Sequence, residues 1–396
     1  GVQLIPEEDE FKYDFDVLDV TKLWPEEVVP VEIIGRMTLN RLVDNFFAEE
    51  EQSSFDPSNL VPGINFSSDP VLQGRVFAYR DTDYHRLGTS NIEHIPINQP
   101  LVDVNFNQRD GYSRYRIDVD PVHFHNNSLA QGTPAEAGPE EGGFTQYPEK
   151  VEGQITREIP SASFEDHFSQ ARLFWNSMSP PEKYNIIKTF IFHVARVKSK
   201  SVRQQVVDMF SNVDQDMAAQ IADSVDANPP KGTQSNTTAS SPVLSEANTI
   251  YSPATLKVGI LIGDGYDSQE VNAVMEALKQ NGVFFDVISE KLGQVTGSDN
   301  TKIEVNKAFI ATSPVLCDAY YVVGGNARDQ SKFDMDIAEF INMTYKHYKP
   351  IGIATTAENY IQKQGNLSGV VFAKDNPSFV DDFIAAVTQQ RFWDRT

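Results

Sequence analysis

The sequence predicts a chain of at least two domains, in which a mixed α and β region and a helical region precede an α/β domain with a parallel sheet. The chain has 396 residues, more than one hydrophobic core usually serves. A stretch rich in Pro, Ser, Thr and Asn at residues 226–253 reads as a linker, because it nearly lacks apolar residues. After it, strand-like and helix-like segments alternate, which is typical of a parallel sheet covered by helices on both faces.

Residues 1–125 combine strand-like, helical and irregular segments. The run VVPVEIIGRMTLN at 28–40 predicts a strand, because it is rich in β-branched residues. Residues 69–88 predict a helix, since Asp69 suits an N-cap and Pro70 suits the first helical position.

Residues 126–225 read as a connection followed by helices. Gly, Pro and Glu are frequent in residues 126–160, which predicts an extended connection without a packed element. In residues 162–225 apolar side chains recur with helical spacing, so we expect several helices that pack as a small layer. Pro180 and Pro181 lie where the first turn of one of these helices is expected.

Residues 254–396 alternate between two patterns. Short β-branched runs predict four strands, at 255–263, 283–289, 317–325 and 349–356. Between and after them, apolar residues with helical spacing predict three helices, at 270–282, 334–347 and 377–394. This alternation predicts a separate flavodoxin-like domain of ordinary size.

Composition excludes several classes of function. The formal charge is −23, from 56 acidic and 33 basic residues, which argues against nucleic acid or an anionic membrane as a partner. No apolar run approaches the roughly 20 residues that a membrane-spanning helix needs. Cys317 is the one cysteine, so the sequence holds no internal disulfide and no CxxC motif, and we expect a buried apolar side chain there.

The compartment is suggested only by acceptor motifs for N-glycosylation. The motif marks an acceptor and no more, and it also arises by chance in a chain rich in Asn and Ser. We expect a secreted, extracellular protein, with a cytoplasmic or peroxisomal location as the alternative; the C-terminus does not carry the Ser-Lys-Leu peroxisomal signal. The five acceptors are Asn65, Asn126, Asn236, Asn342 and Asn366.

The helix predicted at 69–88 places a phenol between two arginines. At 100° per residue, Arg75, Tyr79 and Arg86 fall within about 40° of one another, and Asp83 flanks this face. A cation beside a phenol favours the phenolate, and a phenolate can ligate ferric haem. Spacing alone favours the alternative, in which the tyrosine ring packs against the apolar stems of the arginines.

The same stretch resembles a known family signature. GRVFAYRDTDYHRLG is similar to R-x-F-x-Y-x-D-[AST], which surrounds the proximal haem ligand of haem catalases, and its matches are Arg75, Phe77, Tyr79, Asp81 and Thr82. FDVLDVTKLWP, NIEHIPINQP and SFEDHFSQARLFWNSMSPPEK also look like catalase sequence. The resemblance covers about residues 3–225. It implies an α+β catalase core, with part of an antiparallel β-barrel, the wrapping region and the proximal haem helix in 1–125 and a helical domain in 126–225.

The resemblance implies a catalytic role for three residues. Tyr79 would be the tyrosinate that binds the iron, and so the metal ligand of the site. Arg75 would be its charge partner, and Asp69 would hold Arg75 from behind.

Three further residues would contact the cofactor. Arg86 would bind a haem propionate, and Phe55 would pack against the haem. Asp83 stands where the family commonly has Gln, His or Glu near the haem edge. The haem would be of the b type or a modified d type. NADPH is not expected, because the Trp-Pro-His segment of NADPH-binding catalases is Trp24-Pro25-Glu26 here.

The resemblance also implies a reaction and partners. Catalases dismutate hydrogen peroxide to oxygen and water. In the family the distal histidine and asparagine precede the Lys-x-Trp-Pro segment, which begins at Lys22 here. We therefore expect an N-terminal catalase segment as a partner, which supplies the acid–base chemistry on peroxide. We also expect a homotetramer with interwoven arms.

Residues 254–396 point to the large-subunit branch of catalases. This part is similar to the amidotransferase superfamily, in which a nucleophilic cysteine follows a strand. Thr355 occupies the cysteine position and Thr356 the position of the next histidine, so we expect an inactive site. Two alternatives to catalase function stay open: a ligand-binding or chaperone-like flavodoxin-like module, and a hydrolase that works through Thr355.

Overall fold

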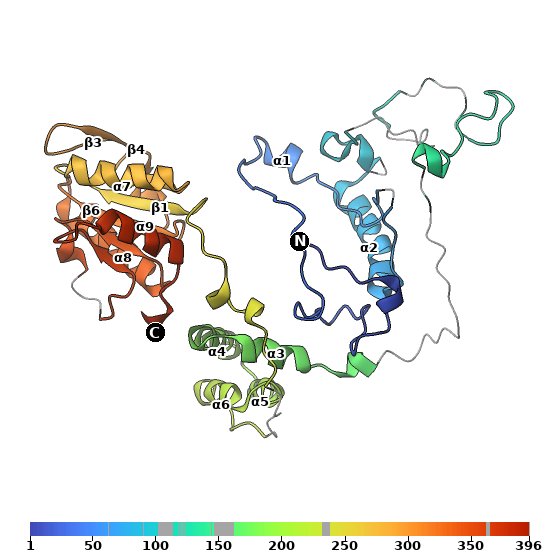
Figure 1. Cartoon of the computed structure of the whole chain (residues 1–396), viewed down its shortest axis with the longest axis horizontal. Coiled ribbons are helices and arrows are strands. Elements are labelled where there is room, and N and C mark those ends of the chain that lie inside the picture. Colours follow the sequence, from blue (N-terminus) through green and yellow to red (C-terminus); the bar gives the residue numbers. More distant parts are fainter. Residues whose placement is uncertain are drawn as a thin grey trace. The chain divides into compact units, whose positions relative to one another are not determined.

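The computed structural model divides the chain into two compact units, residues 1–173 and 174–396, whose elements are shown in Figure 1. Asn236 and parts of the predicted segments 126–160 and 226–253 lie outside the described residues. The structure describes residues 1–61, 63–89, 91–101, 114–117, 119, 122, 124–143, 145, 162–231, 238–361 and 365–395.

The first unit contains the helix predicted from residues 69–88. This helix, α2 (Pro70–Leu87), is preceded by the short helix α1 (Phe46–Glu49). The Asp69 carboxylate accepts a hydrogen bond of 2.8 Å from the backbone N–H of Val71, and Pro70 occupies the first helical position. Gly88 ends α2 with φ 67°, a left-handed conformation that glycine adopts without steric cost. The predicted helix is confirmed at both ends.

The strand predicted at 28–40 is wrong. Within the described residues of the first unit, backbone pairing between segments amounts to one isolated antiparallel bridge, between Val2 and Glu32. A strand needs a neighbour for its backbone groups, and β-branched composition alone does not provide one. The described residues therefore do not confirm the part of a β-barrel that the resemblance implies.

The first unit buries few apolar side chains. Its described apolar residues that are fully buried are Val29, Ile92, Ile95 and Val122. Many large apolar side chains of the same unit lie in water, with exposed fractions of 81% for Ile33, 84% for Met37 and 90% for Leu42. Polar contacts therefore hold much of this unit together. Residues of the candidate site make some of these contacts.

The helices predicted at 162–225 are confirmed. They are α3 (Ser169–Ser177), α4 (Pro180–Val194), α5 (Lys200–Phe210) and α6 (Gln215–Ser224). Pro180 begins α4, and Ser179 and Glu182 form a capping box at its start. The side chains that these helices bury together include Trp175, Ile187, Val194, Val207, Met217 and Ile221.

Residues 257–372 contain a six-stranded sheet in the order β5-β2-β1-β6-β7-β8, all of whose pairings are parallel. A separate antiparallel pair, β3 (Gly293–Thr296) and β4 (Lys302–Val305), lies in a stretch with no predicted element. The sheet strands are β1 (Lys257–Ile262), β2 (Phe284–Ser289), β5 (Lys307–Ala308), β6 (Ala319–Gly324), β7 (Ile351–Ile353) and β8 (Val370–Phe372).

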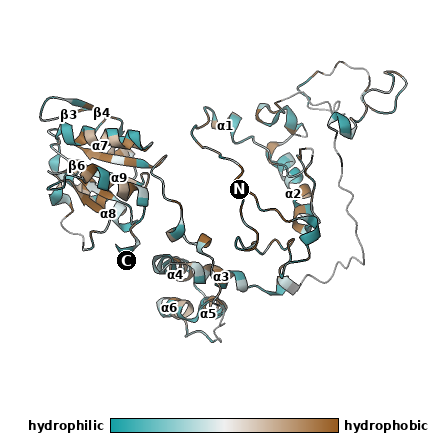
Figure 2. Cartoon of the chain, in the orientation of Figure 1, coloured by the Kyte–Doolittle hydropathy of each residue, from teal (hydrophilic) through white to brown (hydrophobic). Residues whose placement is uncertain are grey.

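Helices cover both faces of this sheet, as the alternation predicted. On β6, the Tyr320 ring packs on Phe340 of α8 (Gln330–Lys346), and the next residue, Tyr321, packs on Phe379 and Phe383 of α9 (Phe379–Gln389). Because successive side chains of a strand point to opposite faces, α8 and α9 lie on opposite sides. Helix α7 (Ser268–Gln280) contacts α9 and shares its side. The strands between them are mostly apolar (Figure 2).

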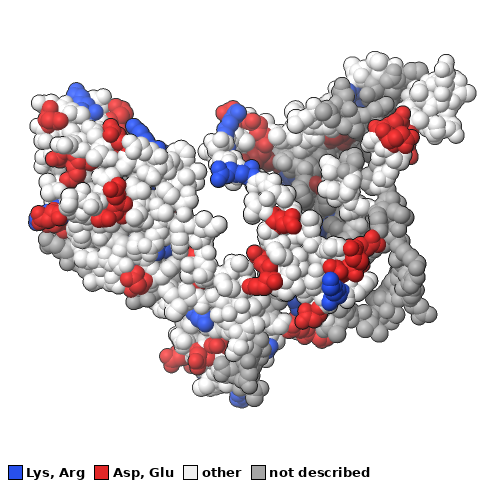
Figure 3. Space-filling model, in the orientation of Figure 1, with Lys and Arg blue, Asp and Glu red and all other residues white. Residues whose placement is uncertain are grey.

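The charge of the chain is spread over its surface. On the face drawn in Figure 3, Asp and Glu side chains gather in several clusters, whereas Lys and Arg lie singly or in small groups. Among the described residues, none of the helices has the length and apolar character needed to cross a membrane.

Candidate functional site

Helix α2 brings Arg75 and Tyr79 together one turn apart. A guanidinium nitrogen of Arg75, Nη2, lies 3.4 Å from the Tyr79 hydroxyl oxygen. The guanidinium carbon lies 5.1 Å from the centroid of the Tyr79 ring, within the range of a cation–π contact. Arg75 is exposed and Tyr79 is half-buried, so the pair faces outward from α2.

Phe55 completes an aromatic contact on this face. Its ring centroid lies 5.3 Å from that of Tyr79, at an interplanar angle of 70°, which is an edge-to-face arrangement. The Phe55 residue is 61% exposed, so one side of the ring is left free. The two rings and the arginine present an apolar surface beside a phenolic oxygen.

Asp83 and Arg86 contact the chain that leads to Phe55. The buried Asp83 carboxylate accepts hydrogen bonds from the Ser54 hydroxyl at 2.5 Å and from Arg86 at 3.2 Å. Arg86 also donates to the backbone carbonyls of Glu51 at 2.5 Å and Ser53 at 2.6 Å. Asp83 and Arg86 therefore hold the segment before Phe55 against α2.

The structure thus brings together three of the six predicted site residues directly: Arg75, Tyr79 and Phe55. Asp69 uses its carboxylate to cap α2, and no ion pair joins it to Arg75 among the described residues. The Arg86 guanidinium donates hydrogen bonds to two backbone carbonyls and to Asp83, all within the first unit.

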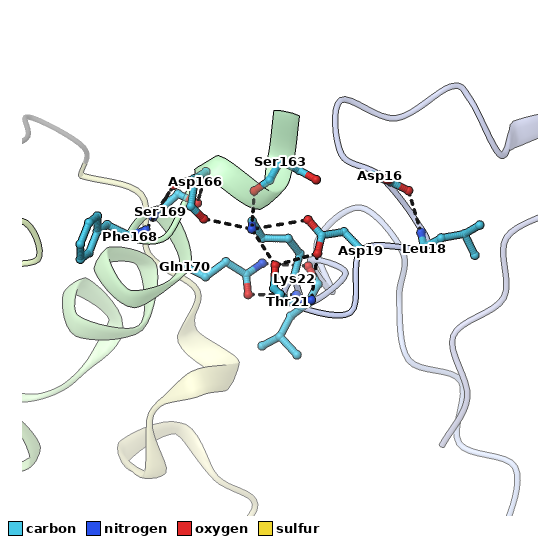
Figure 4. Close-up of polar contacts among 11 residues, drawn as sticks. Asp16, Leu18, Asp19, Thr21, Lys22, Ser163, Asp166, Phe168, Ser169 and Gln170 are labelled. Atoms are coloured by element: carbon cyan, nitrogen blue, oxygen red, sulfur yellow. Dashed lines mark hydrogen bonds and ion pairs between the residues drawn. The ribbon is translucent and has the colours of Figure 1, made fainter. Parts of the chain in front are cut away.

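A second polar cluster, around Lys22, fastens the Lys-x-Trp-Pro segment (Figure 4). The Lys22 ammonium donates to the backbone carbonyls of Ser163 at 2.9 Å and Asp166 at 3.1 Å. It also lies 3.5 Å from a carboxylate oxygen of Asp19. Burial by itself would raise the pKa of Asp19, but hydrogen bonds from Ser163 and Thr21 and the charge of Lys22 lower it to about 2. The carboxylate therefore stays ionised at neutral pH.

A cavity of about 460 Å³ adjoins this cluster in the same unit. Acidic residues dominate its charged lining, since Lys22 is the one basic residue among the described residues that line it. Trp24 forms part of its wall. The acidic lining residues are Glu7, Glu10, Asp19 and Asp69.

In the second unit, Thr355 follows β7 and meets a carboxylate from α7. The Thr355 hydroxyl donates to Glu270 Oε2 at 2.8 Å, and the Tyr321 hydroxyl donates to Glu270 Oε1 at 2.7 Å. Burial and the Glu270 charge raise the pKa of Tyr321 well above its ordinary value. Sequence reasoning did not foresee Glu270, because it is 85 residues from Thr355 along the chain.

Cys317 is 1% exposed, and burial raises the pKa of its thiol, as expected for a small buried side chain. The described residues include no cluster of three or more His, Cys, Asp or Glu that could hold a metal ion.

Three family models match the chain in order. The model described as Catalase matches residues 1–131, the one described as Catalase-related immune-responsive matches 161–225, and the C-terminal domain found in long catalases matches 254–396. Catalase-2 of Bacillus subtilis (strain 168) is 50% identical over the whole of this chain. The chain belongs to the catalase family.

Other catalases agree over the same span. The chain is 49% identical to a catalase of Alkalihalophilus pseudofirmus and 36% identical to catalase HPII of Mycobacterium avium, again over its full length. It spans 58% of the length of each of these three relatives. The family match to residues 254–396 places it with the long catalases.

The residues on α2 fit the haem that a catalase carries. Catalases bind haem iron through a tyrosine, and the half-buried Tyr79 offers a phenolic oxygen with a cation 3.4 Å away. The exposed Phe55 ring offers an apolar contact for a flat macrocycle. Tyr79, Arg75 and Phe55 are the residues that would hold it.

Sequence reasoning missed Ser54, Asp56 and Arg80. Arg80 Nη2 lies 2.5 Å from Asp56 Oδ2, and the Asp56 side chain is 6% exposed. One face of α2 carries a charged residue at every third position: Arg80, Asp83 and Arg86. That spacing indicates that another segment of the chain packs along this face. Which segment they hold depends on contacts distant in sequence.

Proposed function

We propose that this chain is the proximal, haem-holding part of a catalase that dismutates hydrogen peroxide to oxygen and water. The observation that carries the proposal is the Arg75–Tyr79 contact of 3.4 Å on the outward face of α2, inside the region that matches the catalase family model. The names and identities of the three relatives support the same activity.

The chain's own residues have defined tasks in this reaction. Tyr79 presents its phenolic oxygen as the iron ligand, and the Arg75 guanidinium lies 3.4 Å from that oxygen. Phe55 keeps water from one side of the Tyr79 ring through their edge-to-face contact. Haem, when bound, supplies the redox chemistry of iron. Peroxide cleavage also needs a proton moved between two oxygens, which is general acid–base work.

We assign that acid–base work to an N-terminal catalase segment that associates with this chain. The exposed apolar side chains of the first unit support such a partner, since apolar surface of this extent marks interaction sites. We propose that the first unit becomes part of an antiparallel β-barrel when that partner supplies neighbouring strands. A homotetramer, as the resemblance implies, is the assembly we propose.

We also propose a flavodoxin-like fold for residues 254–396. Without the two-residue edge strand β5, the order is β2-β1-β6-β7-β8. This places the first strand between the second and the third, which is the flavodoxin-like order.

For cofactors, we propose haem of the b type or a modified d type and no NADPH. Support for the second point is the cavity beside Trp24, because a lining with four acidic residues disfavours a polyanionic dinucleotide. The visible spectrum of the native protein distinguishes the two haem types.

For location, we propose secretion. Asn65, Asn126, Asn342 and Asn366 are all exposed, as glycan acceptors must be. A loss of mass on treatment of the native protein with an N-glycosidase is the expected result, and an unchanged mass contradicts glycosylation.

The central test combines this chain with the N-terminal catalase segment and haem. Tyr79→Phe removes the phenolic oxygen, so we expect loss of the tyrosinate–iron absorption bands and of oxygen evolution. Tyr13→Phe, in the same unit, is the matched control and retains both. A wild-type spectrum in Tyr79→Phe contradicts the proposed ligand. Haem-free native protein that prevents aggregation of other chains would favour a chaperone-like module instead.

A further inference from the structure

Residues 51–58 run antiparallel to α2, and three charged side chains of the helix hold them. Arg80 contacts the far end of this segment, through Asp56 and Ser58. Asp83 contacts Ser54 in its middle, and Arg86 contacts the carbonyls at its start. Arg80, Asp83 and Arg86 lie three residues apart, so each successive turn of the helix meets an earlier part of the segment.

Phe55 lies between two of these contacts. On one side of it, the Ser54 hydroxyl is 2.5 Å from a carboxylate oxygen of Asp83. On the other side, Asp56 Oδ2 is 2.5 Å from Arg80 Nη2. The carboxylates of both pairs are nearly buried, with side-chain exposures of 5% for Asp83 and 6% for Asp56. A residue fixed on both sides can neither slide along the helix nor turn away from it.

The local chain around Asp56 is also ordered before it meets Arg80. Its other carboxylate oxygen accepts hydrogen bonds from the backbone N–H of Ser58 at 2.8 Å and from the Ser58 hydroxyl at 2.6 Å. Burial would raise the pKa of Asp56, but the Ser58 hydrogen bonds and the Arg80 charge lower it. A second anchor holds the other end, since Asn98 accepts from the N–H of Ser54 at 2.8 Å and donates to the carbonyl of Gln52 at 2.8 Å.

Apolar packing cannot fix the Phe55 ring by itself, because the residue is 61% exposed. Its recorded ring contact is the edge-to-face contact with Tyr79, at 5.3 Å. Such a pair adds only a modest stabilisation beyond that of its buried area. The place of the ring must therefore come from the backbone on either side of it, which the polar pairs determine.

We propose that Asp56–Arg80 and Ser54–Asp83 are positioning pairs. They hold the Phe55 ring against Tyr79 and thereby fix the orientation of the phenol toward the haem iron. This inference rests on the proposed function, in which Tyr79 is the iron ligand. Among the described residues, the Tyr79 hydroxyl is contacted by Arg75 and not by any of these four. They act through Phe55, and Arg80 is also the immediate neighbour of Tyr79 on α2.

The test uses the complete protein, with the N-terminal segment present and haem bound. Ser54→Ala and Arg80→Met each remove one pair, and Arg80→Lys keeps the charge at the second. The matched control is Lys12→Met, which removes an ion pair of 3.0 Å with Asp9 in the same unit, outside residues 33–47. The measurements are haem content, the position of the tyrosinate–iron charge-transfer band, and the rate of oxygen evolution.

We expect Ser54→Ala and Arg80→Met to retain haem but to shift the charge-transfer band and to slow oxygen evolution about 10-fold. This is less than the roughly 100-fold loss that a misplacement of about 1 Å can cause, because each variant keeps the other pair and the Asn98 anchor. Arg80→Lys should restore most of the band position, and Lys12→Met should match the wild type. If both disruptive variants keep the wild-type band, even with lower stability, the pairs are only structural and the inference is overturned.

A failure of the proposed function has a different signature. In that case the wild type has no tyrosinate–iron band, or Tyr79→Phe leaves the band unchanged. A band that Tyr79→Phe abolishes and the pair variants leave in place keeps the function and overturns the positioning role alone.

Discussion

Removal of the Glu270 carboxylate should lower the stability of the second unit. Its carboxylate joins three groups: the Tyr321 hydroxyl at 2.7 Å, the Thr355 hydroxyl at 2.8 Å and the Thr355 N–H at 3.2 Å. Thr355 is exposed, so in Glu270→Ala water replaces the lost contacts there. Tyr321 is fully buried, so its hydroxyl has no such replacement.

The magnitude follows from that difference in exposure. A buried donor left without an acceptor costs about 1–3 kcal/mol. Loss of an acidic side chain from the first turn of α7 adds about 0.3–1 kcal/mol, because it no longer complements the helix dipole. We expect Glu270→Ala to lower the free energy of unfolding by the sum of these contributions, about 1.3–4 kcal/mol.

Native-state hydrogen exchange of the β6 amides is the assay, because a chain with more than one domain does not give a single unfolding free energy. Glu276→Ala, at an exposed position on the same helix, is the control. The double variant Glu270→Ala/Tyr321→Phe lacks the hydroxyl that Glu270→Ala leaves without an acceptor. Its loss of unfolding free energy should therefore be smaller than the sum of the two single losses, by about 1 kcal/mol or more. The reasoning is refuted if Glu270→Ala resembles Glu276→Ala, or if the two single effects simply add.

Three further outcomes test other parts of the structure. The folded-state pKa of Asp19 is about 2, below its ordinary 3.8, so its stabilising contribution is complete above about pH 4 and is lost as the pH falls toward 2. Asp19→Asn should therefore flatten the dependence of the first unit's stability on pH in that range. An unchanged dependence contradicts the assignment. Gly259→Ala places a methyl group against the buried Tyr320 ring, so we expect about 1–3 kcal/mol of destabilisation by hydrogen exchange in β1, whereas native protection would show that the ring can move aside. Thr355→Ala should leave oxygen evolution at the wild-type rate, and a large loss would revive a catalytic role for this residue.

The sequence predicted those features that depend on neighbours along the chain. The ends of α2 follow from Asp69, Pro70 and Gly88, which act within one or two turns. The Arg75–Tyr79 contact likewise needs only helical geometry, because the two residues are four apart.

Features that depend on distant partners were missed or wrong. The contacts of Arg80 and Asp83 require a segment 22 to 29 residues earlier, and no local pattern specifies where that segment lies. The run 28–40 has strand composition but no pairing neighbour among the described residues, so its propensity is not realised. Strand β8 is three residues long, too short for an alternating pattern to mark it.

The exposed apolar side chains of residues 33–47 should affect how much of the protein accumulates in the cell. Ile33, Met37, Leu39 and Leu42 are each more than four-fifths exposed, with values of 81%, 84%, 89% and 90%. Chains that show such surface are captured by chaperones or aggregate, in proportion to the time they spend uncovered. We therefore expect cellular abundance to follow the rate at which this surface is covered, so that a slow assembly step lowers the yield even when the finished protein is stable.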